Sequence, residues 1–212
     1  MHIEVESLNG HQARSQLSTR LLLEAAGELV AEGGYASMTL ATVGERAGYS
    51  RSLATARFGS KTKLLEALVD RIVRRWTITT ITPRAEGLSG LDGLMVLLEG
   101  IRDQYRLDRR SLRVLYALMF EALGPGQELR ERFVELHRET WEVLAGQIRR
   151  GIADGSIRAT VDPVVEAQVV VAMLRGVGYQ WRLAPEAFDP VPPLDHMIET
   201  TRTRLGAARL GA

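Results

Sequence analysis

Residues 39–59 read TLATVGERAGYSRSLATARFG, and this stretch decides the fold. Thr39 and Ser50 are each suited to cap the N-terminus of a helix, so the stretch predicts two short helices. Gly48 lies between them and accepts the left-handed backbone that a tight turn requires. Gly44 is small enough to let the two helices cross closely. The stretch therefore predicts a helix-turn-helix motif.

Basic residues gather in and after this motif, although the whole chain carries a net charge of only +1. Residues 46–75 hold eight Lys and Arg and two acids, a net charge of +6, whereas residues 1–45 hold two Arg and six Glu, a net charge of −4. A basic segment beside a helix-turn-helix motif favours double-stranded DNA as the partner. On charge alone, a solvated surface is the alternative.

Length and composition limit the other classes of protein. A chain of 212 residues that is 45% hydrophobic allows one or two globular domains. It contains no Cys, which excludes disulfides, Cys-ligated zinc, Fe–S clusters and thiol catalysis. The N-terminal segment MHIEVESLNG lacks the apolar stretch of a secretory signal, and the longest apolar run, residues 169–174, is far shorter than a membrane span of roughly 20 residues. We therefore expect a cytoplasmic protein with no membrane partner.

The rest of the chain predicts helices, because apolar residues recur at helical spacing and alternating strand patterns are nearly absent. The expected helices cover about residues 18–32, 60–76, 91–106, 109–123, 127–153, 163–183 and 194–208. Glycine and proline between residues 77 and 93 predict a break between two parts of the chain. Further prolines predict a loop before the last helix, namely Pro185, Pro190, Pro192 and Pro193. The expected fold class is all-α.

The expected helix over 163–183 is apolar around most of its circumference. Such a helix must be buried on more than one side, and a second subunit is a natural cover for it. A central core helix within one chain is the alternative. Together, the helix over 163–183 and the last helix predict a homodimer interface. Its candidate contacts are Val165, Val169, Ala172, Leu194, Met197, Ile198 and Leu205.

Residues 21–69 resemble the N-terminal domain of the TetR family of transcriptional regulators. The matching positions are Ala25-Ala26, Leu29, Gly34-Tyr35, Thr39, Ala47-Gly48-Tyr49-Ser50, Phe58, Ser60 and Lys61. Three positions depart from the family pattern: Val43-Gly44 replaces Ile-Ala, Thr55 replaces an aromatic residue, and Arg57 replaces His. The resemblance implies a three-helix DNA-binding domain, about 15–60, and a helical ligand-binding and dimerisation domain, about 61–208.

Eight residues of the motif and its flanks are candidate DNA contacts. Arg51 and Ser52, in the first turn of the second helix, are candidates for base edges, because Arg pairs bidentately with guanine. Short or cationic donors suited to phosphates are Thr39, Ser50, Thr55 and Lys61. Arg46 and Arg57 suit either a phosphate contact or a surface salt bridge.

The resemblance also implies a cavity for a small effector in the C-terminal half. Candidate lining residues are Tyr105, Tyr116, Met119, Phe120, Trp141 and Met173. Side chains of this kind favour an apolar or aromatic ligand, although each is also suited to an ordinary core. Glu99, Glu121 and Arg175 are possible polar anchors, with ion pairing or solvation as the alternative for each.

The sequence offers no catalytic machinery. The four His are scattered, and neither a phosphate-binding loop nor a nucleophile elbow is present. We therefore expect no enzyme, no cofactor and no metal. The hypothesis is a homodimeric regulator, most simply a repressor that binds a palindromic operator and is released by a small ligand. A ligand-independent architectural DNA binder and a helical adaptor or carrier remain the alternatives.

Overall fold

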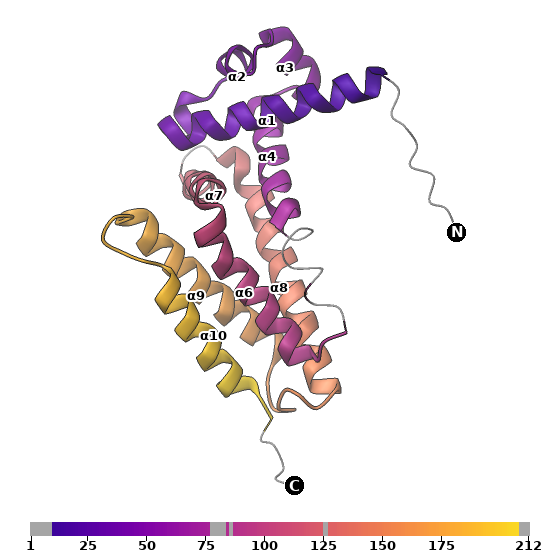
Figure 1. Ribbon diagram of the computed structural model, residues 1–212, viewed down its shortest axis with the longest axis vertical. Helices are drawn as coiled ribbons and strands as arrows, with labels where there is room; N and C mark the ends of the chain where they lie inside the picture. Colours follow the sequence, from indigo (N-terminus) through magenta and orange to yellow (C-terminus); the bar gives the residue numbers. More distant parts are fainter. Residues whose placement is uncertain (1–9, 77–83, 85–86, 125–126, 208–212) are drawn as a thin grey trace. The chain divides into compact units, whose positions relative to one another are not determined.

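The computed structural model describes residues 10–76, 84, 87–124 and 127–207, and within these ranges the regular elements are helices (Figure 1). One isolated antiparallel bridge joins Ile157 and Gly206. The all-α prediction is confirmed. The expected break over 77–93, the N-terminal segment and the end of the last expected helix lie partly outside the described residues. Within those residues, no helix combines the length and apolarity needed to cross a bilayer.

The chain divides into two compact units, Met1–Asp70 and Arg71–Ala212, and the division falls inside helix α4 (Lys61–Trp76). The first unit also contains α1 (Gly10–Ser37), α2 (Leu40–Arg46) and α3 (Arg51–Phe58). Side chains of all four helices form its core, among them Leu22, Ala26, Val43, Ala54 and Leu64, which are fully buried. Helix α1 is longer than the expected 18–32, and it is kinked at Gly34, where φ is 74°.

Two glycines shape the helix pair α2–α3. Gly48 adopts a φ of 75°, as the turn requires. A Cβ atom on Gly44 would lie 2.9 Å from the backbone carbonyl of Ser50 and 3.1 Å from the amide nitrogen of Arg51. These distances are too short for any side chain, so the close crossing expected at Gly44 is confirmed.

The second unit contains α6 (Gly90–Leu107), α7 (Arg109–Glu121), the short 3₁₀ helix η2 (Gln127–Leu129), α8 (Arg130–Ala153), α9 (Pro163–Leu183) and α10 (Val191–Leu205). Helix α8 packs against α6 and α9, and α10 packs against α6 and α9 (Figure 1). Its core is apolar, with Trp181, Tyr105, Leu98 and Leu118 fully buried.

The last helix begins earlier than the sequence predicted, at Val191 instead of 194. Pro192 and Pro193 therefore lie in its first turn and not in a loop. This position suits proline, because the first amide groups of a helix have no partner within the helix and the fixed φ of proline is already helical.

Helices α6 and α8 cross with almost no space between their backbones. A Cβ atom on Gly90 would lie 2.0 Å from the amide nitrogen of Gly151 and 2.3 Å from its Cα atom. Two hydrogen bonds span the crossing, from Gly90 N to Asp154 Oδ2 (2.6 Å) and from Leu91 N to Ser156 Oγ (3.1 Å). The crossing fixes the spacing of two helices that line the cavity described below.

Candidate DNA-binding surface and ligand cavity

Helix α3 presents a solvent-exposed face made by Arg51, Ser52 and Thr55. The side chains of Arg51 and Thr55 have no hydrogen bond or ion pair to the described residues, and Ser52 Oγ lies 2.8 Å from Ser50 Oγ. Helix α3 buries Ala54 against the rest of the unit. The fold therefore holds α3 by one side and leaves donors on the other.

The caps predicted for α2 and α3 are both present. Thr39 accepts a hydrogen bond from Thr42 N (3.1 Å), and its own amide donates to Thr42 Oγ1 (2.9 Å), which makes a reciprocal capping box. Ser50 Oγ accepts from Leu53 N (3.2 Å). Each cap satisfies an amide that would otherwise lack a partner at the helix start.

The two arginines for which the sequence left alternatives both have partners within the first unit. Arg46 donates two hydrogen bonds of 3.0 Å to the carboxylate of Glu32, and Glu28 lies 3.5 Å away. The hydrogen bond and charge of Glu32 raise the pKa of Arg46. Arg57 donates to Ser15 Oγ (2.7 Å) and Ser18 Oγ (3.3 Å) on α1. Both arginines thus tie the motif to α1.

Lys61 also has an internal partner, because its Nζ donates to the carbonyl of Tyr35 (2.7 Å) and lies 3.6 Å from the centre of the Tyr35 ring. The eight candidate DNA contacts therefore fall into two groups. Five of them cap or fasten the motif: Thr39, Arg46, Ser50, Arg57 and Lys61. Arg51, Ser52 and Thr55 form the exposed face of α3. As DNA contacts all eight stay predictions.

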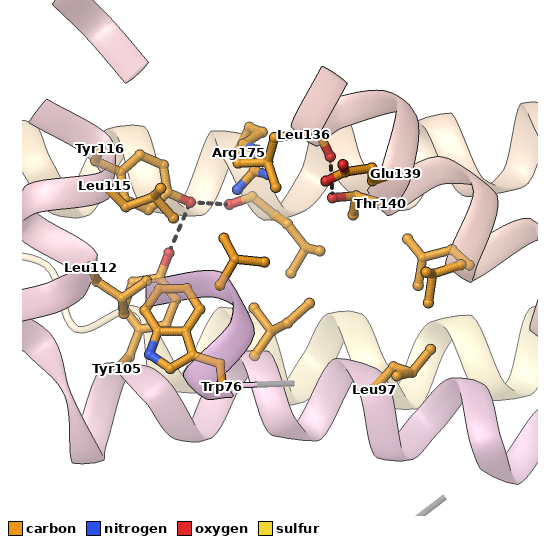
Figure 2. A pocket seen from close by; sticks show the side chains of 15 residues that line it. Trp76, Leu97, Tyr105, Leu112, Leu115, Tyr116, Leu136, Glu139, Thr140 and Arg175 are labelled. Atoms are coloured by element: carbon orange, nitrogen blue, oxygen red, sulfur yellow. Dashed lines mark hydrogen bonds between the residues drawn. The ribbon is translucent and has the colours of Figure 1, made fainter. Parts of the chain in front are cut away.

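The second unit contains a partly open cavity of about 290 Å³ (Figure 2). Its walls come from the end of α4 and from α6, α7, α8 and α9. The lining residues are Val73, Trp76, Leu97, Ile101, Tyr105, Leu112, Leu115, Tyr116, Leu136, Glu139, Thr140, Val143, Leu144, Leu174 and Arg175. Most are aliphatic or aromatic, which is typical of a site for a small apolar molecule.

The sequence identified only part of this lining. Tyr105 and Tyr116 line the cavity, whereas four other candidates do not: Met119, Phe120, Trp141 and Met173. The reason is helix geometry, because one residue turns a helix by about 100°. On α8 the lining residues recur at spacings of three and four, as Leu136, Thr140 and Val143 do, and Trp141 falls outside this series. Trp141 packs edge-on against His137 instead. Phe120 is 36% exposed and meets Tyr179 with ring centres 6.0 Å apart.

The sequence did not identify the aliphatic lining residues, because each of them also fits an ordinary hydrophobic core. Leu97, Ile101 and Tyr105 share one face of α6 at spacings of four, a periodicity that identifies a buried face but not a hollow behind it. Of the possible anchors, Arg175 lines the cavity, whereas Glu99 pairs with Arg84 at 2.9 Å.

A short hydrogen-bond chain crosses one wall of the cavity (Figure 2). Tyr105 OH donates to Tyr116 OH (3.1 Å), which donates to the carbonyl of Leu174 (3.3 Å). Burial, helped by Tyr116, raises the pKa of Tyr105. The Tyr105 phenol therefore stays neutral, and the hydrogen-bond chain links the wall segments from α6, α7 and α9.

Helix α9 carries an exposed apolar stripe along its length. Its members recur at alternating spacings of four and three and are Val165, Val169, Ala172, Gly176, Tyr179 and Leu183. The opposite face, with Val170, Leu174 and Trp181, is buried within the chain. The sequence predicted that α9 is buried on more than one side. Within one chain, the stripe is the apolar face of α9 that stays exposed.

The candidate dimer contacts on α10 lie inside the second unit. Leu194, Met197, Ile198 and Leu205 are all buried within the chain, at 0–8% exposure. They pack in the core of the second unit because α10 turns its apolar side towards α6 and α9. The candidates Val165, Val169 and Ala172 on α9 are exposed and stay available.

No cluster of three or more His, Cys, Asp or Glu in the described part of the chain is arranged to hold a metal ion. His137 is half-buried, and burial lowers its pKa; its Nδ1 lies 2.7 Å from the carbonyl of Phe133.

Comparison with known proteins agrees with this architecture. Residues 22–68 match the family described as bacterial regulatory proteins, tetR family, and residues 91–208, over half of the chain, match the BetI-type transcriptional repressor C-terminal family. The probable HTH-type transcriptional regulator ArpR of Pseudomonas putida is 25% identical over 186 residues, which cover 84% of this chain and 87% of that protein.

Solved structures share the fold at lower identity. A putative TetR-family regulator from Rhodococcus sp. superposes with a TM-score of 0.77 at 20% identity, over 90% of this chain and all of that one. A SmeT–triclosan complex gives a TM-score of 0.78 at 21% identity, over 92% and 94% of the two chains. The matched families consist of DNA-binding regulators and not of enzymes, as the sequence predicted. The chain belongs to the TetR family of bacterial transcriptional regulators.

Proposed function

We propose that this regulator is a homodimeric repressor that binds a palindromic operator through α3 and releases it when a small molecule fills the cavity of the second unit. One observation carries the proposal: the same chain offers an exposed donor face on a helix-turn-helix motif and a partly open apolar cavity lined by other helices.

DNA recognition falls to the exposed face of α3. Arg51 has no internal partner among the described residues, so its guanidinium is free to pair with a guanine in the major groove. Thr55 and Ser52 supply hydroxyl donors on the same face. Arg46 and Arg57 act mainly by fixing α2 and α3 on α1, since their guanidinium groups are already bonded there.

Dimerisation falls to the apolar stripe of α9. Side chains at alternating spacings of three and four form the seam through which two helices pack together. Ala172 and Gly176 in the middle of the stripe permit a close approach of the two backbones. Two-fold symmetry then requires two operator half-sites about one DNA turn apart, roughly 34–36 Å between centres.

Release by ligand follows from linkage. A molecule that binds one conformer of the dimer better than another shifts the population towards it, and DNA affinity falls if that conformer fits the operator poorly. The cavity supports this role, because a well-packed domain has few voids larger than a water molecule. SmeT, which shares the fold, has been solved with triclosan.

The test is selection of preferred duplexes from a random pool by the purified full chain, repeated at two salt concentrations. We expect a palindromic consensus whose affinity falls steeply with salt, because each phosphate contact releases counterions. Salt-dependent binding without any consensus would instead support an architectural DNA binder. No binding at either salt concentration would support the adaptor or carrier.

A further inference from the structure

Arg175 differs from every other polar residue of the cavity wall in having no internal partner. Its Nε is buried and has no hydrogen-bond partner, and its guanidinium has no ion pair with any described residue. Figure 2 shows Arg175 among the lining side chains, with Tyr116 on one side and Thr140 and Glu139 on the other.

The remaining polar groups of the wall are already satisfied. Thr140 Oγ1 donates to the carbonyl of Leu136 (2.7 Å), and Trp76 Nε1 to Asp108 Oδ2 (3.4 Å). The two tyrosines bond each other and Leu174.

Glu139 is the acid in the lining, and it lies 3.5 Å from the guanidinium of Arg132. The carboxylate of Glu139 therefore already has Arg132 as an ion-pair partner.

The charge of Arg175 acts on two neighbouring titratable groups, Tyr105 and His137, and neither of them supplies a negative charge to it. Burial raises the pKa of Tyr105 and lowers the pKa of His137, so that neither carries a charge near neutral pH. A guanidinium cannot give up its proton in a protein. An uncompensated positive charge at the wall of an apolar cavity is unfavourable, and an anion that enters the cavity would remove the penalty.

We propose that the effector is an apolar molecule that carries one carboxylate, with the carboxylate paired to Arg175 and the apolar body among the aliphatic side chains. This inference rests on the proposed function and names the ligand class of that same cavity. Guanidinium and carboxylate form paired hydrogen bonds with matching geometry.

The volume of the cavity also indicates a size of ligand that would fit. An engineered apolar cavity of about 150 Å³ holds one benzene molecule. The cavity of about 290 Å³ therefore suits a body of about two fused rings. Naphthalene-2-carboxylate has this size and charge, and naphthalene-2-carboxamide is its neutral match in shape.

The experiment measures binding of both compounds to the full chain by calorimetry, without DNA. We expect the carboxylate to bind about 10- to 100-fold more tightly than the amide, as is typical of a hydrogen-bonded pair with a charged group. In Arg175→Met this preference should fall to about one, while the affinity for the amide stays the same. Arg175→Lys, which keeps a cation, should retain part of the preference.

Arg182→Met is the matched control. Arg182 lies on the same helix and also has a buried Nε without a partner, but it does not line the cavity. Its substitution should leave the preference unchanged. Equal affinities of the two compounds for the unmodified chain, no binding of either at about 1 mM, the range of weak ligands, or a preference that survives Arg175→Met would each overturn the proposal.

DNA binding separates this proposal from the proposed function. Arg175→Met should bind the selected duplex as tightly as the unmodified chain, because the substitution lies outside the helix-turn-helix unit. If no duplex is ever selected, the regulator hypothesis fails while the calorimetric result still stands. If a duplex is selected and the carboxylate binds without releasing it, the ligand class holds and the release step is wrong.

Discussion

Replacement of Gly90 by Ala tests the crossing of α6 and α8. The new Cβ would lie 2.0 Å from Gly151 N, whereas ordinary contact begins at 3.4 Å, so the two backbones must separate by about 1.4 Å. Both partners at the contact are backbone atoms, and no change of side-chain rotamer relieves the overlap. The separation also lengthens the hydrogen bonds to Asp154 and Ser156.

Overpacking of this kind destabilises a protein by about 1–3 kcal/mol. We expect a loss near the upper end, about 2–3 kcal/mol, because two hydrogen bonds lie at the same crossing. For a chain of this length, each kcal/mol lowers the melting temperature by about 2–4 °C, so the melting temperature should fall by roughly 5–10 °C. Urea unfolding gives the same free energy independently.

Gly146→Ala is the control. Gly146 lies on α8, and a Cβ there would meet no atom within 4 Å. Alanine should stabilise this site by about 0.5–1 kcal/mol, because glycine loses more backbone entropy in a helix. If Gly90→Ala matched Gly146→Ala in stability, the helices would not be as close as the structure shows and the reasoning would be refuted.

Four further outcomes are expected. Arg51→Ala should relax the base preference in duplex selection; an unchanged consensus would remove Arg51 from the readout. Lys61→Ala should weaken binding to all DNA sequences and lower the slope of log affinity against log salt concentration by about one unit. If the variant loses stability while this slope stays constant, Lys61 acts only through its hydrogen bond to Tyr35. Ala172→Arg should sediment as a monomer, unlike Ala31→Arg on exposed α1 surface. Hydrogen bonds from Ser156 and Gly90 lower the pKa of Asp154 from its ordinary 3.8. As the pH falls, the carboxyl of the unfolded chain therefore takes up a proton before that of the folded chain. The contribution of Asp154 to folding stability is complete above pH 3.8 and is lost as the pH falls through the lower folded pKa. In urea unfolding at a series of pH values, Asp154→Asn should make the loss of stability at acid pH less steep.

The helix-turn-helix motif was predictable because each of its requirements is local. Thr39 and Ser50 cap helices within three residues of themselves, Gly48 turns the chain where it stands, and Gly44 approaches a backbone only six residues away. Caps and turns depend on single residue types, so a short stretch of sequence holds the whole specification.

The cavity was only partly predictable because its wall joins residues from five helices. Which face of each helix lines a hollow depends on crossings such as Gly90–Gly151, and no local pattern encodes them. The same limit applies to the candidate dimer contacts on α10. Leu194, Met197 and Leu205 form an apolar face that fits either a partner subunit or the chain's own core, and only the packing against α6 and α9 decides between them.

The structure distinguishes arginines that the sequence cannot, because it shows which guanidinium groups already have an acid partner. Arg46, Arg51 and Arg175 carry the same group, yet Arg46 is paired with Glu32 while the other two have no acid partner among the described residues. A paired guanidinium offers little to a new anion, because binding would first require the existing pair to separate. An unpaired one gains its first strong partner on binding. The fold thus leaves Arg51 on the exposed face of α3 and Arg175 in the cavity wall without an acid partner in the described part of the chain. The two proposals made for them, a DNA contact and a ligand carboxylate, would each supply that partner.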